Sequence, residues 1–357
     1  MSNNYEDYKP LNPLPPRRRR SKFVMFTQWL VIVLLIIAIS GSAAFFVVTH
    51  KNAQNTGGYP DETFGAPETE TNEPIETDAP EQSSSENTDI VPPVIEYKNV
   101  EFSNDDVHAG ALSYISSTYK AKYPTTAELV KLYGNNDNAY MLSSADIMVK
   151  RDMVQNLNGF IKAFNEATGK GNIVIWTGYR NADRQQKVYD DYVKQNGEAA
   201  AVGKVAKAGE SDYHTGYTVG IRVKVDNGYQ HPSRVDGYSW LLENCHKFGF
   251  VERYPADKVN ATGFSPDESS LCLRYVGQPH AEIMKQKNMC LEDYLTYIKD
   301  YKYDSSLQFT SEDGTNYGVY FYPENNELEN TLVKVPKESV YTIVGNNMDG
   351  FIVAYQK

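Results

Sequence analysis

The stretch SDYHTGYTVGIRVKV, residues 211–225, passes from a polar loop into a regular alternation of side chains. From residue 217 onward, Tyr, Val, Ile and Val alternate with Thr, Gly, Arg and Lys. Because successive side chains of a strand point to opposite faces, this alternation predicts a half-buried β-strand. His214 precedes the strand beside Gly216, and we expect it to be a surface or loop histidine.

Apolar spacing predicts further elements on both sides of this strand. Val154, Leu157, Ile161 and Phe164 recur three or four residues apart, which predicts an amphipathic helix at residues 146–169 with a glycine C-cap. Other predicted helices lie at residues 182–195, 198–207, 238–248, 279–287 and 291–298, and predicted strands at 173–176 and 271–276. This mixture of helices and short strands indicates an α+β domain.

After about residue 303 the pattern becomes wholly strand-like. Predicted strands lie at residues 317–322, 332–335, 341–344 and 351–355, and GNNMDG at 345–350 predicts a turn between the last two. A module of about 55 residues is marginally stable alone, so we expect this all-β extension to pack on the preceding domain.

The N-terminal residues predict a membrane anchor. Residues 1–22 are polar and rich in Pro and Arg, which predicts a disordered tail. Residues 23–48 are almost wholly apolar and uncharged, and the run exceeds the roughly 20 residues that a membrane-spanning helix needs. A cleaved signal peptide is the alternative, but its apolar region is shorter, about 7–15 residues. Arginines at 17–20 precede the run, so we expect a single-pass cell-membrane protein with a cytoplasmic N-terminus and an extracytoplasmic main domain.

Charge distinguishes the segments that follow. Residues 52–98 hold eleven Asp and Glu and one Lys among many Pro, Ser and Thr, which predicts an extended acidic linker at 49–98. The chain has a formal net charge of −11, and because the first 51 residues carry +5, the remainder carries −16. Such acidity argues against nucleic acid as a partner. The predicted organisation is a tail at 1–22, a transmembrane helix at 23–48, a linker at 49–98, a folded domain at 99–302 and a β extension at 303–357.

Several motifs together resemble one enzyme family. TGYRNADRQQKVY at residues 177–189 is similar to the SGYRS…QQ.LY signature of the VanY-like zinc D-alanyl-D-alanine carboxypeptidases, cell-wall peptidases of the hedgehog/DD-peptidase fold. Further matches follow in the family's order: GESDYHTG at 209–216, NCHKFGFVERYP at 244–255, RYVG at 274–277 and MCLEDYL at 289–295. Collinear matches are far more specific than one short motif. The resemblance implies an α+β domain with a small antiparallel sheet and surrounding helices.

The resemblance also implies a catalytic zinc ion, held by two histidines and an aspartate, with a glutamate as general base. The family pattern Ser-x-His-x-x-Gly-x-Ala-x-Asp, aligned from Ser211, puts Tyr213 at the histidine position and Gly220 at the aspartate position. The pattern Glu-Pro-Trp-His-Tyr-Arg-Tyr-Val-Gly, aligned on RYVG, puts Ser269 at the general-base position and Cys272 at the last histidine position. Zinc needs about three protein donors, so we expect neither zinc nor hydrolysis by this route.

Neither a shifted histidine nor the cysteine is expected to restore this chemistry. A one-residue slip would turn His214 to the opposite face of the strand, and Ile221, not a carboxylate, lies seven residues beyond it. Cys272 could act as a thiol nucleophile only with a base within reach, and a small buried residue is its expected role. With Cys245 and Cys290 it makes three cysteines, which allow at most one disulfide.

Other positions keep the family's residues. Arg180 matches the arginine that in the family contacts the substrate carbonyl and its oxyanion, and Gln185 and Ser211 match positions that line the substrate cleft. A purely structural role is the alternative for each. Arg222 follows Gly220 by two residues, so on a strand it shares that face. We hypothesise that its guanidinium is a charge surrogate in part of the vacated metal site, and the alternative is a solvated rim arginine.

The sequence therefore predicts a membrane-anchored, extracytoplasmic D-alanyl-D-alanine carboxypeptidase-like protein that has lost zinc and hydrolysis. It would bind a peptidoglycan peptide or a protein partner in the family's cleft. Two alternatives remain open. One is an active metallo-D,D-carboxypeptidase that trims terminal D-alanine from stem peptides, and the other is a binding protein whose β extension is the working module, with the peptidase-like domain as its scaffold.

Overall fold

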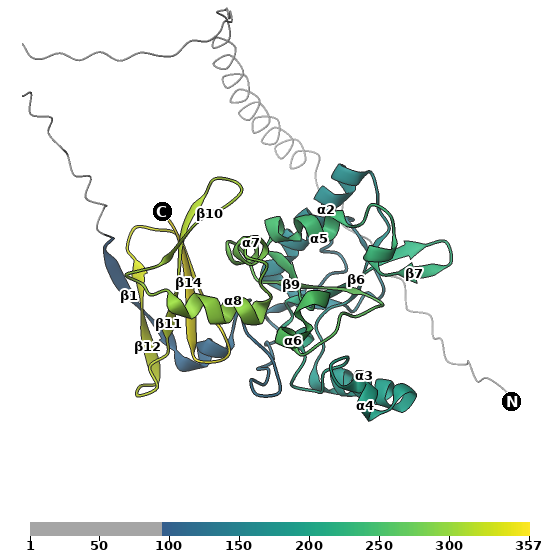
Figure 1. Ribbon diagram of the computed structural model, residues 1–357, viewed down its shortest axis with the longest axis horizontal. Helices are drawn as coiled ribbons and strands as arrows, with labels where there is room; N and C mark the ends of the chain where they lie inside the picture. Colours follow the sequence, from purple (N-terminus) through teal and green to yellow (C-terminus); the bar gives the residue numbers. More distant parts are fainter. Residues whose placement is uncertain (1–94) are drawn as a thin grey trace, which may run out of the picture. The chain divides into compact units, whose positions relative to one another are not determined.

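The computed structural model describes residues 95–357 (Figure 1). The predicted tail, the transmembrane helix at 23–48 and nearly all of the predicted linker lie outside these residues. Within the described part of the chain, every helix is too short or too polar to cross a membrane.

A six-stranded sheet forms the centre of the peptidase-like part of the fold. Its strands follow the order β3-β5-β6-β9-β8, and β7 pairs with the end of β6. The strands are β3 Met141–Leu142, β5 Ile173–Thr177, β6 Thr218–Val225, β7 Gly228–Gln230, β8 Phe250–Glu252 and β9 Leu271–Tyr275. β3 and β5 run parallel, so the prediction of an antiparallel sheet is wrong at this edge. The reason is the crossover through helix α2 (Val154–Thr168), which connects β3 to β5.

Strand β6 lies in the middle of this sheet and is buried over most of its length. Val219, Ile221 and Val223 share one core with the apolar side chains of α2. Thr218 and Gly220, on the opposite face, are buried as well, so the prediction of a half-buried strand is wrong for the first half of β6. It holds for the second half, where Arg222 is half-buried and Lys224 exposed. Apolar and polar residues alternate because one face of the strand packs on an apolar core and the other face forms part of a polar site.

The predicted helices are present, with shifted ends. α2 begins at Val154 because residues before it form strand β4 (Met148–Lys150), which pairs with β2 (Leu129–Lys131), and a 3-10 turn. It ends as predicted at Gly169, whose φ of 64° is the left-handed conformation that glycine favours. The other helices are α3 Ala182–Asn196, α4 Glu198–Ala201, α5 Trp240–Asn244, α6 Val259–Thr262, α7 His280–Gln286 and α8 Leu291–Tyr297. α4 is shorter than predicted because the chain becomes extended at Val202.

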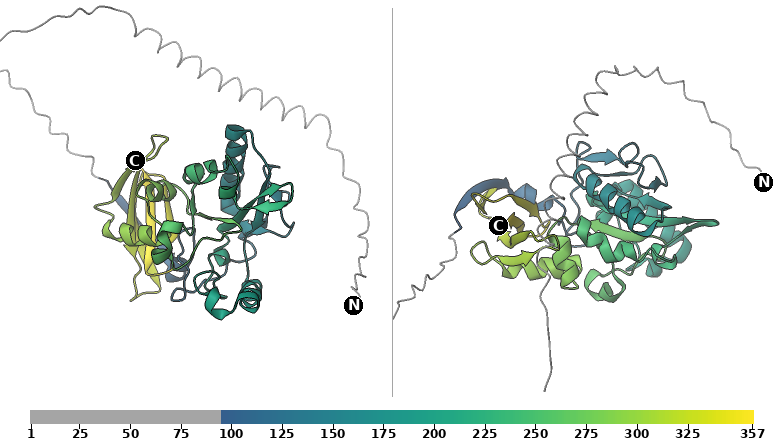
Figure 2. Two further views of the ribbon diagram at one scale, coloured as in Figure 1. Left: turned by 45° about the vertical axis from the view of Figure 1, so that its right-hand side comes forward. Right: turned by 90° about the horizontal axis from the view of Figure 1, so that it is seen from above.

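The C-terminal residues form strands where strands were predicted. β10 (Leu307–Thr310) was not predicted, and it joins β11 (Asn316–Pro323), β14 (Gly350–Gln356) and β13 (Tyr341–Gly345) in a four-stranded antiparallel sheet. β12 (Asn330–Pro336) pairs with β1 (Tyr97–Ser103), from the other end of the described chain. Figures 1 and 2 show β1 beside the C-terminal strands. The predicted domain boundary at residue 99 therefore falls inside β1, which local patterning did not reveal.

A buried group of four charges connects the elements around the sheet. Asp212 is 1% exposed, and its carboxylate accepts from Arg253 Nε at 2.6 Å and lies 3.0 Å from Arg274 Nη1. Arg253 also donates to both oxygens of Glu292 on α8, at 2.8 and 3.1 Å. Burial alone would raise the pKa of Asp212, but the charges of Arg253 and Arg274 outweigh it and hold this pKa below its usual range.

Arg274 extends this network toward the C-terminal sheet. Its Nη2 donates to the backbone carbonyls of Ala111 and Ser113, each at 3.0 Å. The segment that holds these carbonyls packs on β13, where the Val344 side chain fills the space beside Gly110. The charges therefore stabilise both the peptidase-like part and its junction with the C-terminal strands.

Replacing Asp212 with asparagine should lower the free energy of unfolding by about 3–5 kcal/mol, the cost of removing one partner from a buried ion pair. Asparagine keeps the shape of the side chain, but it leaves Arg253 with Glu292 alone and Arg274 without an acidic partner among the described residues. The midpoint and slope of urea unfolding of the full-length protein measure the change.

Asp191→Asn is the matched control for this substitution. Asp191 pairs with Lys187 on the solvated face of α3, where an ion pair stabilises a protein little. If Asp212→Asn unfolds at the same urea concentration as Asp191→Asn, the buried network does not stabilise the fold.

Candidate functional site

Three of the four substituted family positions meet at one point of the sheet. Gly220 on β6 and Cys272 on β9 lie directly opposite each other in the antiparallel pair. A Cβ atom on Gly220 would lie 3.2 Å from the Tyr213 hydroxyl oxygen, so this phenol covers the glycine. The hydroxyl also lies against the Cys272 thiol. The structure thus brings Tyr213, Gly220 and Cys272 together, as the family register requires.

Ser269, the fourth substituted position, lies near the end of the loop that precedes β9. Its hydroxyl accepts from Arg222 Nη2 at 2.8 Å and donates to Asp267 Oδ1 at 2.7 Å. It lines the same cavity as Tyr213 and Cys272. A general base needs a pKa near the working pH, and a serine hydroxyl does not meet this requirement.

Local backbone chemistry fixes Tyr213 in a 3-10 turn, Asp212–Thr215. The Ser211 hydroxyl caps this turn by accepting from the Tyr213 N–H, and Gly216 ends it with a φ of 76°. Burial, and then the neighbouring Cys272, raise the pKa of the Tyr213 hydroxyl well above its usual value. The phenol at the former histidine position is therefore neutral and protonated.

Arg180 lies over the face of the Tyr213 ring, with its guanidinium carbon 4.0 Å from the ring centroid. Its Nε donates to Thr177 Oγ1 at 3.2 Å, and its Nη1 donates to Gln185 Oε1 at 3.1 Å. Gln185 is buried and donates in turn to the Ala206 carbonyl at 2.7 Å. A guanidinium has five N–H donors, so three remain for a ligand in the cavity that Arg180 lines.

His214 lies in the turn before β6, as a loop histidine would, but it is not on the surface, so the prediction of a surface residue is wrong. Its side chain is fully buried between two backbone groups. Nε2 accepts from the Gly209 N–H at 2.9 Å, so Nδ1 carries the proton and donates to the Arg180 carbonyl at 2.7 Å. Burial lowers the pKa of His214, which favours this neutral form. His214 therefore positions the backbone of Arg180, and local patterning gave no signal of a contact with a loop 34 residues away.

Arg222 extends from β6 toward the loop that holds Ser269. Its guanidinium stacks on Trp176, 4.0 Å from a ring centroid, and donates to Ser269 and Ser270 at 2.8 and 2.7 Å. Among the described residues, Arg222 is not one of the side chains that line the cavity, so it supports the Ser269 wall from behind. Its hypothesised role as a charge surrogate stays a prediction.

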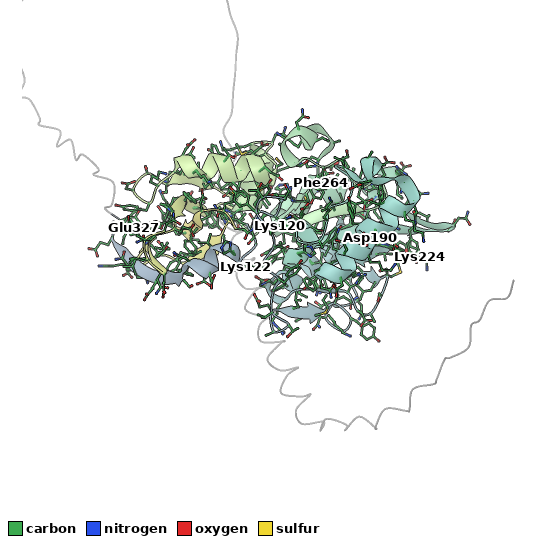
Figure 3. The ribbon with its side chains drawn as sticks, turned by 90° about the horizontal axis from the view of Figure 1, so that it is seen from below. Lys120, Lys122, Asp190, Lys224, Phe264 and Glu327 are labelled. Atoms are coloured by element: carbon green, nitrogen blue, oxygen red, sulfur yellow. The ribbon has the colours of Figure 1, made fainter. Side chains whose placement is uncertain are left out.

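A cavity of about 530 Å³ opens beside these residues, within the usual size range of ligand pockets. Six residues that the family patterns singled out line it: Arg180, Gln185, Ser211, Tyr213, Ser269 and Cys272. Sequence reasoning missed other parts of its wall, including Lys204 after α4, Tyr254 after β8, and Phe264 and Asp267 in the loop after α6. Phe264 is labelled in Figure 3. Loop residues carry no periodic signal, so only the folded structure reveals them.

The side chains at this point do not fit the zinc ion that the family resemblance implies. Gly220 offers no donor, and the Tyr213 phenol is neutral. Burial raises the pKa of Cys272 to about 12. Even as a thiolate, its sulfur would be a single donor, whereas zinc needs about three protein donors. In residues 95–357, no three His, Cys, Asp or Glu side chains lie close enough together to hold a metal. The same pKa argues against Cys272 as a nucleophile, and all three cysteines are free and buried.

Comparison with known proteins identifies relatives across most of the described region. A family model described as "VanY: D-alanyl-D-alanine carboxypeptidase" matches residues 146–278. A D-alanyl-D-alanine carboxypeptidase of Enterococcus faecium is 31% identical over 254 residues, which are 70% of this chain and 76% of that protein. A D-alanyl-D-alanine carboxypeptidase of Enterococcus faecalis (strain ATCC 700802 / V583) is 35% identical over 135 residues, which are 35% of this chain and 48% of that protein.

A solved structure shares the fold. The crystal structure of the vancomycin resistance D,D-dipeptidase VanXYg, in complex with a D-Ala-D-Ala phosphinate analog, matches with a TM-score of 0.62 and 26% identity. The match covers 73% of this chain and 100% of that chain. Together with the order of the motifs, these relationships show that the chain belongs to the VanY family of D-alanyl-D-alanine carboxypeptidases.

Proposed function

We propose that this chain is a membrane-anchored cell-wall protein whose cavity binds a peptidoglycan stem peptide without hydrolysing it. The observation that carries the proposal is the meeting of Tyr213, Gly220 and Cys272, whose side chains do not make a zinc site. Relatives of this chain are D-alanyl-D-alanine carboxypeptidases, so we infer that the peptide carries a D-alanyl-D-alanine end. The site then recognises this peptide end and leaves it intact.

Arg180 supports the binding of a peptide with a free carboxylate. Its side-chain partners in residues 95–357, Thr177 and Gln185, are both neutral, so its positive charge has no ion-pair partner there. A guanidinium binds a carboxylate or carbonyl oxygen through charge-assisted hydrogen bonds without a metal. Lys204 adds a second positive charge to the lining, and the loop after α6 adds acidic side chains. A peptide with both a carboxylate and an amine complements this cavity.

Two features argue against hydrolysis. The family's route needs a metal-activated water, whose ligands are replaced here, and a general base, whose position is held by Ser269. An alternative covalent route would need a reactive thiolate. Burial keeps Cys272 protonated, so this route is closed at neutral pH.

The N-terminal sequence supports a location at the outer face of the cell membrane. The apolar run at 23–48 is long enough to span a bilayer, and arginines at 17–20 favour a cytoplasmic N-terminus. The acidic, proline-containing segment at 49–98 is of a kind that stays extended, because like charges repel. It would hold the peptide-binding domain away from the membrane, within the cell wall.

Purified full-length protein should contain no stoichiometric zinc and should release no D-alanine from a synthetic pentapeptide that ends in D-alanyl-D-alanine. The protein is dialysed against a buffer that contains zinc, and its metal content is measured by inductively coupled plasma mass spectrometry. An enzyme-coupled assay measures the released D-alanine. One zinc ion per chain together with D-alanine release would overturn the proposal in favour of an active carboxypeptidase.

A variant that carries the family's ligands provides the positive control: Tyr213→His, Gly220→Asp and Cys272→His. Removing the Tyr213 phenol relieves one of the two close contacts that a side chain at position 220 would make, and Thr177 Cγ2, 2.9 Å from the new Cβ atom, must shift to admit the aspartate. This triple variant should retain about one zinc ion per chain, because zinc is held by three protein donors at about 2.0–2.2 Å. Equal zinc contents in the wild type and the variant would contradict the idea that these substitutions abolish the metal site.

Isothermal titration calorimetry with the same pentapeptide should show saturable binding to the full-length protein. Arg180→Gln should weaken this binding by about 10- to 150-fold, because a hydrogen bond to a charged group contributes roughly 1.5–3 kcal/mol. Arg184→Gln is the matched control, since Arg184 is exposed in the first turn of α3, four residues after Arg180, and lies outside the cavity lining. If the pentapeptide binds both variants equally well, Arg180 is not the anchor of the ligand.

A further inference from the structure

The Tyr213 hydroxyl lies where the family's metal ligands would converge. It lies above Gly220 and against the Cys272 thiol, and Tyr213 lines the same cavity as Arg180. We propose that this hydroxyl takes the place of the metal as the group that contacts the carbonyl oxygen of the ligand's last peptide bond. A peptide must occupy the cavity for this contact to exist, so the proposal rests on the proposed function.

The Tyr213 hydroxyl is hydrogen-bonded to the Cys272 sulfur, a weak acceptor that a ligand oxygen can displace. The Cys272 thiol beside it is a weak hydrogen-bonding group, whereas buried tyrosine hydroxyls usually have a good partner. Because burial raises the pKa of Tyr213, the phenol stays protonated and can donate throughout the neutral pH range. An amide carbonyl oxygen of a bound peptide is an acceptor that satisfies this donor.

Arg180 supplies a second donor beside the hydroxyl. Its guanidinium lies 4.0 Å over the Tyr213 ring and retains N–H groups that Thr177 and Gln185 do not use. One charged and one neutral donor on the same wall resemble the donor pairs that stabilise oxyanions in acyl-transfer enzymes. Ser269 at the general-base position supplies no activated water, so these donors orient an intact peptide bond and do not promote its cleavage.

Gly220 makes room for the hydroxyl. A Cβ atom at this position would lie 2.9 Å from Thr177 Cγ2 and 3.2 Å from the Tyr213 hydroxyl oxygen. The first distance is too short for two carbon atoms, so Thr177 must move for any larger residue, and the second is tight, so the phenol must also give way. Gly220 is therefore a positioning residue for Tyr213, and the two substitutions act as a pair.

A thermodynamic cycle between the protein and the peptide tests the contact. In the protein, Tyr213→Phe removes the hydroxyl but keeps the ring beneath Arg180. In the pentapeptide, an E-alkene in place of the last amide removes the carbonyl oxygen but keeps the shape of the chain. Calorimetry with the full-length protein gives the affinities of both proteins for both peptides. Tyr189→Phe is the matched control, because Tyr189 is on α3 and outside the cavity lining.

Tyr213→Phe should weaken binding of the amide pentapeptide by about 2- to 12-fold, the range for one hydrogen bond of roughly 0.5–1.5 kcal/mol. It should leave binding of the alkene analogue unchanged, and Tyr189→Phe should change neither. If Tyr213→Phe lowers the affinity for both peptides by the same factor, or lowers neither affinity, the hydroxyl does not contact the carbonyl. The proposed function still stands in that case. If the wild type binds neither peptide, the proposed function itself fails.

A spectroscopic measurement separates a direct contact from an indirect structural effect. In full-length protein labelled with ¹³Cζ-tyrosine, the resonance that disappears in Tyr213→Phe belongs to Tyr213. Addition of the amide pentapeptide should shift this resonance, because a new acceptor changes the electron density at the phenol oxygen. A resonance that shifts equally with the alkene analogue would overturn the inference.

Discussion

The ion pairs around Asp212 are the constraint on which the rest of the structure depends. This carboxylate lies between Arg253 and Arg274, and it immediately precedes Tyr213 in the chain. Because charges buried away from water must be paired, the network leaves few positions for the 3-10 turn that carries Asp212. That turn places the Tyr213 phenol above Gly220. Stability of the fold and geometry of the site therefore have one physical origin.

Close packing explains how other side chains can stand at the family's metal-ligand positions while the cavity beside them remains open. Protein interiors contain few voids, so removal of a metal and an aspartate from the sheet face requires another group to fill the space. Here the phenol of Tyr213 covers Gly220, and the small, neutral Cys272 lies opposite. The cavity beside them still measures about 530 Å³. Loss of the metal ligands and retention of a binding cavity are therefore compatible in one structure.

Sequence reasoning succeeded where the signal is local or carried by collinear motifs. The C-cap of α2 at Gly169 and the meeting of Gly220 with Cys272 follow from such signals. It failed where distant residues must meet, as in the pairing of β1 with β12 and the burial of His214 against the Arg180 loop. The alternation along β6 also gave a wrong prediction of burial. It identifies one apolar face, but it cannot show that the polar face is buried by a site.

Arg222 links the replacement at position 269 to the rest of the site. Its guanidinium donates to the Ser269 hydroxyl at 2.8 Å. A positive charge at such a distance lowers the pKa of a carboxyl by about 1–3, whereas a general base works best with a pKa near the working pH. A glutamate at position 269 would therefore lie beside a charge that opposes its function, while a serine accepts the hydrogen bond without conflict. Arg222 and Ser269 thus suit each other in the proposed binding site, where a glutamate at 269 would lie beside an opposing charge.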